Sequence, residues 1–147
     1  MRTIEEIIEV TGGWDALHKR PIKIEVENFM PLHVEIIGRG SSGGVVLSVM
    51  HTFLQNGDVM RDPDVVIEIV ADSGDWMPIS YRQDSLGIFQ EPVWSEGGNV
   101  LFDHGLIADL RQFLNKWDAN LKEQGFVAAA KLTASQSSSP NDNECMN

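Results

Sequence analysis

Short segments of alternating or β-branched apolar residues fill most of the chain between residues 22 and 94. Alternation with a period of two is typical of half-buried strands. Asn56-Gly57 is the strongest of the intervening turn signals, because a type I′ hairpin turn needs positive φ at both central positions. The segments that we expect to be strands are 22–28, 32–38, 45–55, 65–71, 76–82 and 88–94. Because the turns between them are short, the sequence predicts an antiparallel meander.

A helical period replaces the strand pattern after the loop SEGG at 95–98. Its apolar residues recur at spacings of three and four and form one stripe, as on an amphipathic helix: Ile107, Leu110, Leu114, Trp117 and Leu121. Asp103 is placed to cap the start of this helix, and Gly125 is placed to end it. The sequence therefore predicts one long helix packed on the sheet.

A second, shorter helix is predicted at the N-terminus, where Ile4, Ile7 and Ile8 share one helical face. Thr3 with Glu6 three residues later matches a capping box. The predicted fold class is α+β: an antiparallel β-meander sheet packed by one long C-terminal helix, with a short N-terminal helix. We expect one domain over residues 1–133 and a disordered polar tail over 134–147.

Composition narrows the setting of this domain. The first ten residues carry three glutamates and do not resemble a signal peptide, and no apolar run approaches the length of a membrane span. Cys145 is the only cysteine, so neither a disulfide framework nor a cysteine metal site can form. These features predict a cytoplasmic protein.

Charge is unevenly distributed along the chain. The formal net charge is −11, and residues 55–96 alone contain nine acidic and two basic residues. An acidic surface repels phosphate backbones and attracts basic proteins. We therefore expect no direct nucleic-acid partner and no membrane partner, although acidic residues can also serve solubility alone.

The acidic stretch FLQNGDVMRDPDV, residues 53–65, resembles a metal loop at first sight. An EF-hand loop needs oxygen ligands at alternate positions and a distant glutamate, and that spacing is missing here. Asn56-Gly57 instead indicates a hairpin turn, and Asp62-Pro63-Asp64 is expected to form a turn that opens the next strand. We expect no metal and no cofactor.

Catalytic motifs are equally weak. The four histidines show no metal-ligand spacing, no nucleophile elbow is present, and the Gly-rich segment 38–44 lacks the Lys-Ser/Thr ending of a phosphate loop. An enzyme is therefore the less favoured interpretation. The alternative that stays open is a ligand cleft lined by His51, Asp58, Tyr81 and Arg82.

Aromatic, acidic and amide residues are interleaved between residues 76 and 94, a composition typical of recognition surfaces. Strand alternation could equally direct several of these aromatic side chains into the core. The candidate binding residues are Asp58, Asp62, Asp64, Trp76, Tyr81, Arg82, Gln83, Asp84, Gln90 and Glu91.

Two stretches within residues 51–91 resemble a small uncharacterised domain family found in plasmid, phage and integrative-element proteins. The matching residues of the first stretch are His51, Gln55, Asn56, Gly57, Asp58, Met60, Asp62 and Pro63. Those of the second are Trp76, Pro78, Tyr81, Gln83, Asp84, Leu86, Gly87, Gln90 and Glu91. The resemblance implies carriage by a mobile genetic element and implies no reaction.

Three functions follow from these observations. The favoured one is a non-enzymatic binding protein whose acidic face docks on a basic protein, such as a nucleic-acid-handling host or defence protein. The second is the small enzyme or ligand-binding domain with the cleft named above. The third is an accessory module that forms a homo-oligomer.

Overall fold

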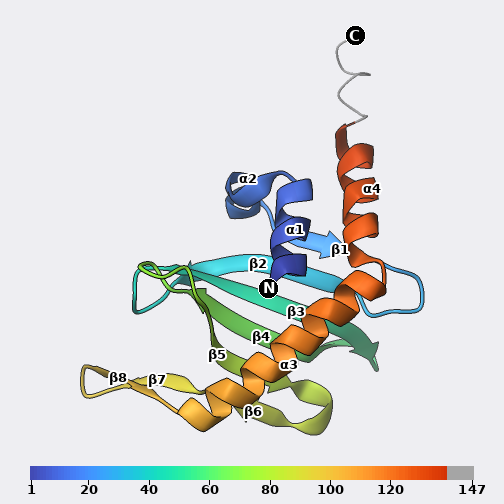
Figure 1. Cartoon of the computed structure of the whole chain (residues 1–147). Helices are drawn as coiled ribbons and strands as arrows, with labels where there is room; N and C mark the ends of the chain where they lie inside the picture. The colour runs from blue at the N-terminus through green and yellow to red at the C-terminus, as the bar shows by residue number, and fades with distance from the viewer. Residues whose placement is uncertain (139–147) are drawn as a thin grey trace.

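The computed structural model describes residues 1–138 and shows an α+β fold (Figure 1). A six-stranded antiparallel sheet runs in sequence order from β1 to β6, and β7 with β8 forms a separate two-stranded sheet. The strands are β1 Ile22–Ile24, β2 Leu32–Arg39, β3 Val45–Gln55, β4 Asp58–Ile69, β5 Trp76–Gln83, β6 Ile88–Gln90, β7 Val93–Glu96 and β8 Asn99–Phe102. The helices are α1 Arg2–Val10, α2 Gly13–Lys19, α3 His104–Glu123 and α4 Phe126–Ser138, with a 3₁₀ turn η1 at Asp84–Leu86. The predicted fold class is confirmed.

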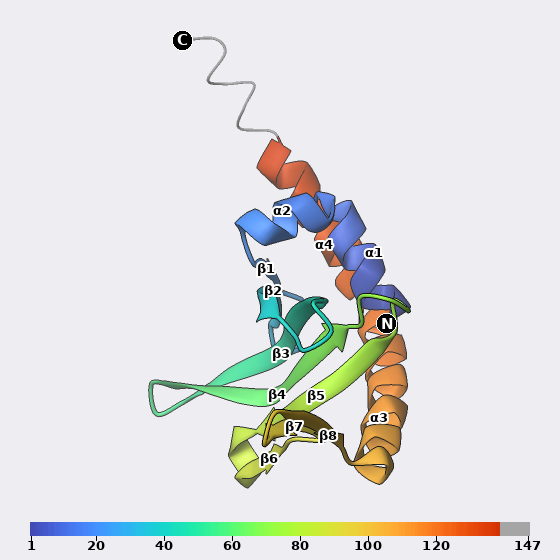
Figure 2. The ribbon, with the colours of Figure 1, turned by 90° about the vertical axis from the view of Figure 1, so that its left-hand side faces the viewer.

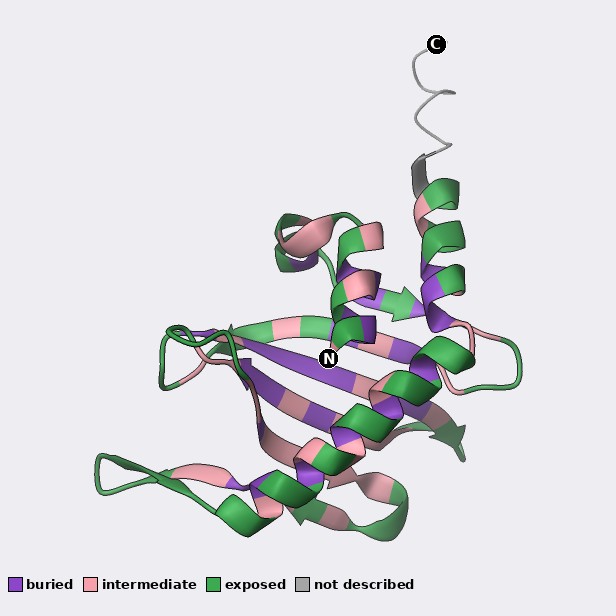
Figure 3. Ribbon diagram, viewed as in Figure 1, coloured by how far each residue is buried: buried purple, intermediate pink, exposed green. Residues whose placement is uncertain are grey.

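The helices α1, α3 and α4 gather on one side of the large sheet, α2 lies above its β1–β2 end, and no helix of the described residues covers the opposite face (Figure 2). The stripe of α3 packs on this sheet, and its five predicted apolar residues are all buried. Along β2, β3 and β4 the buried positions that face the helices form the core (Figure 3). Burial of this apolar surface is the main favourable contribution to folding.

The β3–β4 hairpin contains the Asn56-Gly57 turn, with φ of 54° and 86° at its two central positions. The predicted hairpin is therefore confirmed. The prediction that Asp62-Pro63-Asp64 forms a turn is wrong, because β4 already begins at Asp58. Pro63 lies where the pairing register shifts between Thr52↔Arg61 and Met50↔Asp64. A proline is tolerated there, because an irregular ladder does not require its missing N–H.

The predicted start and end signals of the long helix α3 are confirmed, whereas the predicted cap of the short helix α1 is wrong. The Asp103 carboxylate accepts a hydrogen bond from the Leu106 N–H at 3.1 Å, and α3 ends before Gly125, whose φ is 93°. The helix α1, however, begins at Arg2, so Thr3 is not its N-cap. Asp118 of α3 instead accepts hydrogen bonds from the N–H groups of Thr3 and Ile4, at 3.1 and 3.3 Å.

The sequence predicts a disordered tail from residue 134 onward and does not predict the helix α4. The structure places residues 134–138 of this tail in α4, and residues 139–147 lie outside the described residues. Alanines favour the helix intrinsically, and Phe126, Val127 and Ala130 are buried against the core. Among the described helices, none combines the length and apolar character needed to cross a bilayer.

Candidate protein-binding surface

His51 was a candidate for a ligand cleft, and the structure places it in the core. Its ring lies 5.4 Å from the ring of Trp117 and 5.6 Å from that of Phe126. Its Nδ1–H donates to the Pro31 carbonyl oxygen at 3.1 Å. Burial of the ring lowers the pKa of His51. These contacts suit a neutral structural histidine.

Tyr81 lies on the same side of the sheet but is held by other groups. Its ring packs edge-on against Phe113 at 5.5 Å, and its hydroxyl donates to the Gln83 side-chain oxygen at 3.0 Å. Burial raises the pKa of Tyr81. Arg82 instead covers the Phe89 ring, with its guanidinium carbon 4.5 Å from the ring centroid.

Asp58 stands at the tip of the β3–β4 hairpin, where it pairs with Gln55. Its partner Gln55 lies four residues from His51 along β3, a distance of about 13 Å in an extended strand. The structure therefore does not bring His51, Asp58, Tyr81 and Arg82 together in one cleft.

Several acidic residues of the 55–96 segment have partners within the fold. The Asp84 carboxylate accepts hydrogen bonds from the Arg61 backbone N–H at 2.9 Å and from the Arg61 Nε–H at 3.0 Å. The backbone bond first, and then the guanidinium, lowers the pKa of Asp84. This pair ties η1 to β4, so Asp84 supports the fold and is not a free charge.

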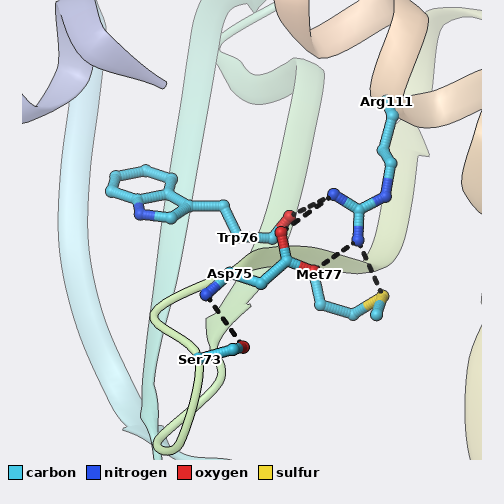
Figure 4. A network of polar contacts seen from close by, with 5 residues as sticks. All are labelled: Ser73, Asp75, Trp76, Met77 and Arg111. Atoms are coloured by element: carbon cyan, nitrogen blue, oxygen red, sulfur yellow. Dashed lines mark hydrogen bonds and ion pairs between the residues drawn. The ribbon is translucent and has the colours of Figure 1, made fainter.

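Asp75 and Arg111 form a second internal pair, which Figure 4 shows. Arg111 Nη2 lies 2.7 Å from Asp75 Oδ2, and its other terminal nitrogen donates to the Trp76 carbonyl oxygen at 3.3 Å. The hydrogen bonds from Arg111 lower the pKa of Asp75. The pair fixes the β4–β5 turn on α3.

Two further carboxylates of β4 are bound by serines. Glu68 is buried and accepts hydrogen bonds from the backbone N–H and the hydroxyl of Ser42. Asp64 accepts one from the Ser48 hydroxyl at 2.7 Å, and its strand partner on β5 is Arg82. Four of the nine acids counted along the segment thus have hydrogen-bond partners within the fold.

The remaining candidate binding residues lie in different places. Asp62 is half-buried on β4, Trp76 packs against the core, and Gln90 pairs with Tyr81 at the sheet edge. Glu91 is exposed just before β7. The ten candidates therefore do not form one continuous face.

A different part of the molecule combines exposed apolar side chains with exposed acids that form no ion pair within the described residues. Residues 93–102, which we call the β7–β8 arm, form a two-stranded sheet that is separate from the main one. On β8, Val100, Leu101 and Phe102 remain 36, 36 and 45% exposed. The arm is attached at its base by a hydrogen bond from the Asp103 N–H to the Pro92 carbonyl oxygen, at 2.8 Å.

Charge around the arm is of one sign. Residues 83–110 contain five acidic residues and no lysine or arginine. Asp84 is the one paired with Arg61, whereas the other four are exposed on or beside the arm: Glu91, Glu96, Asp103 and Asp109. Exposed apolar residues rimmed by charge are typical of protein-binding surfaces.

The sequence contains a local signal for this arm. Gly97 and Gly98, with φ of 60° and 83°, form the turn between two short apolar segments. A two-residue Gly-Gly loop between such segments is a hairpin signal. The stronger helical stripe beyond it favours a simple loop before the long helix, whereas the structure shows a hairpin there.

Within the described residues, no group of three or more His, Cys, Asp or Glu side chains is arranged to hold a metal ion. Comparison with known proteins adds one match: a family model described as a domain of unknown function (DUF6908) covers residues 2–127. No curated protein and no solved structure matches significantly.

Proposed function

This chain belongs to the DUF6908 family, and we propose that it is a non-enzymatic protein whose β7–β8 arm docks on a basic surface of another protein. The observation that supports this function is the arm itself, which exposes Val100, Leu101 and Phe102 within a region that has no lysine or arginine. A two-stranded hairpin is marginal on its own. A partner that covers these apolar side chains would stabilise it.

The acids beside the arm give the partner its expected charge. Glu96 is the last residue of β7 and Asp103 directly follows β8, and both are exposed. Charge complementarity of this kind accelerates association and selects partners, and salt weakens it. A basic protein that handles nucleic acids, of a host or of its defence system, has the required surface.

The setting that we propose is the cytoplasm of a cell that carries a plasmid, phage or integrative element. This setting is supported by the resemblance of the two stretches within residues 51–91 to a domain family found in mobile elements. The genes next to members of the family test this setting, since conjugation, phage or counter-defence genes would be expected among them.

The docking function is tested by affinity capture from a host lysate at about 50 and 500 mM salt, with Leu101→Ser beside the unchanged protein. Leu132→Ser is the matched control, because Leu132 is exposed on α4, away from the arm. We expect a basic protein that is retained at low salt, released at high salt and lost with Leu101→Ser alone. Retention that Leu101→Ser leaves unchanged would exclude the arm as the docking site.

A further inference from the structure

A cavity of about 490 Å³ opens at the end of the fold opposite to the β3–β4 turn, between α1, α2 and the ends of β3, β4 and β5. Its size falls in the range of small-molecule sites, which is about 300–1,000 Å³. Two of the four tryptophans of the chain, Trp14 and Trp76, line it. Both are half-buried, and both also pack against the core.

The two indoles come from distant parts of the chain. Trp14 lies in the first turn of α2, and Trp76 is the first residue of β5. Figure 4 shows the Trp76 side chain directed away from the guanidinium of Arg111, although its carbonyl oxygen accepts from that group. Trp76 thus lines the cavity with its side chain turned away from Arg111, while its carbonyl oxygen helps to hold the β4–β5 turn.

Two carboxylates border the same cavity. Glu5 and Glu9 lie one turn apart on the exposed side of α1, and neither forms an ion pair within the described residues. One cation, Arg39, is also in the lining, and its Nη1–H donates to the Gly43 carbonyl oxygen at 3.0 Å. The formal charge of the lining side chains is therefore negative.

We propose that this cavity binds a small organic cation, with an alkylated ammonium group held against the indoles of Trp14 and Trp76 and balanced by Glu5 and Glu9. An indole face attracts a cation through its quadrupole, and quaternary ammonium groups are bound in this way. A hard metal ion is a poorer match, because calcium needs six to eight oxygen ligands and indoles supply none. An anion would be repelled by the two carboxylates.

This site is separate from the β7–β8 arm, so its test succeeds or fails independently of the proposed docking function. The probes are choline and its uncharged isostere 3,3-dimethylbutan-1-ol, added to the whole 147-residue chain at constant ionic strength. The measurement is the chemical shift of the four indole N–H signals in a heteronuclear NMR spectrum. Single Trp→Phe variants assign each signal.

We expect choline to shift the signals of Trp14 and Trp76 saturably at millimolar concentration, and to leave those of Trp94 and Trp117 unchanged. The isostere has the same shape without the charge and is expected to bind at least about tenfold more weakly. Equal binding of the two probes, equal shifts at all four indoles, or no shift with choline would each overturn the proposal.

Glu9 and Arg39 are exposed charges at the cavity, so replacing either one leaves the core intact. The two replacements are expected to change choline affinity in opposite directions. Glu9→Gln removes an attractive charge and should weaken choline binding about three- to tenfold, whereas Arg39→Gln removes a repulsive one and should strengthen it about two- to fivefold. Asp72→Asn, an exposed acid in the β4–β5 turn outside the lining, is the matched control and should leave the affinity unchanged. If Glu9→Gln and Arg39→Gln change the affinity no more than Asp72→Asn does, the charge assignment is wrong.

Discussion

His51 illustrates how one residue links the sheet to two helices. Its ring contacts Trp117 on α3 and Phe126 on α4, and its Nδ1–H is bonded to the Pro31 carbonyl oxygen. A charged imidazolium would lose hydration in this apolar setting. The folded protein therefore favours the neutral ring, which is why burial lowers the pKa of His51 below its ordinary value of 6.5.

This shift predicts a pH dependence of stability. Between the lowered pKa and about pH 6.5 the unfolded chain binds more protons than the native protein, so the free energy of unfolding decreases as pH falls through that window. Above about pH 6.5 the stabilising contribution is complete. We expect His51→Gln to be less stable at every pH and to show a flatter slope in urea unfolding measured at pH 7.5, 6.5 and 5.5.

His33 supplies the comparison for this measurement. Its pKa is also lowered, mainly by burial, while its Nε2 lies 3.0 Å from the Thr52 hydroxyl oxygen. The His33→Gln variant should therefore flatten the slope as well, and the double variant should flatten it further. A His51→Gln slope equal to that of the unchanged protein would contradict the assignment.

Which acids are free could not be read from the sequence. Glu68, Asp75 and Asp84 are bound by Ser42, Arg111 and Arg61, which lie 26, 36 and 23 residues away along the chain. Local charge counting places all three in the most acidic segment, yet their contacts depend on tertiary neighbours. For the same reason the sequence singles out only Gln90 and Glu91 beside the β7–β8 arm, where the exposed acids form no ion pair within the described residues.

At the level of elements, α1 is capped by another helix. The first turn of a helix leaves N–H groups without intrahelical partners, and Asp118 on α3 accepts from two of them. A negative charge there also interacts favourably with the helix dipole. The contact fixes the position of α1 on α3, and with it the orientation of the buried Ile4, Ile7 and Ile8.

Removing this cap should have a defined cost. Asp118→Ala is expected to lower the free energy of unfolding by about 1 kcal/mol, the usual cost of losing a carboxylate cap. Asp109→Ala changes an exposed acid on the same helix and should stay within about 0.5 kcal/mol of the unchanged protein. Urea denaturation followed by circular dichroism measures both, and equal effects of the two variants would exclude the capping role.

Two elements with a strong local signal were predicted correctly. The 3-and-4 stripe of α3 and the Asn56-Gly57 turn each depend on a few neighbouring residues, and both are confirmed. The cap of α1 depends on Asp118, more than 110 residues away, and no local pattern contains it. The strand character of Asp62-Pro63-Asp64 likewise depends on the register shift opposite it on β3.

For the whole molecule, α4 contributes to a core that the other helices share. The family model ends at residue 127, so most of α4 lies outside the matched residues. Phe126 is nevertheless fully buried, with its ring near those of His51 and Phe29. The start of α4 therefore belongs to the folded unit, even though its sequence lacks a clear stripe.

Truncation of this side chain tests that role. Phe126→Ala should lower the free energy of unfolding by about 3–5 kcal/mol, because it removes a large buried ring and leaves a cavity. Leu132→Ala, at a 65% exposed position of the same helix, should cost less than about 0.5 kcal/mol. Thermal and urea unfolding provide the comparison. If Phe126→Ala lowered the free energy of unfolding as little as Leu132→Ala does, α4 would contribute little to the core.

The net charge of −11 also bears on self-association. Two copies that met through their β7–β8 arms would bring Glu96 and Asp103 of each copy together, with no lysine or arginine in residues 83–110 to offset them. This repulsion is long-ranged at low ionic strength and screened at high ionic strength.

We therefore expect sedimentation equilibrium to show a monomer at about 20 mM salt. At about 500 mM salt any association should increase and should be lost with Leu101→Ser. Association that is equally strong at both ionic strengths would show that charge does not keep the arm available for a basic partner.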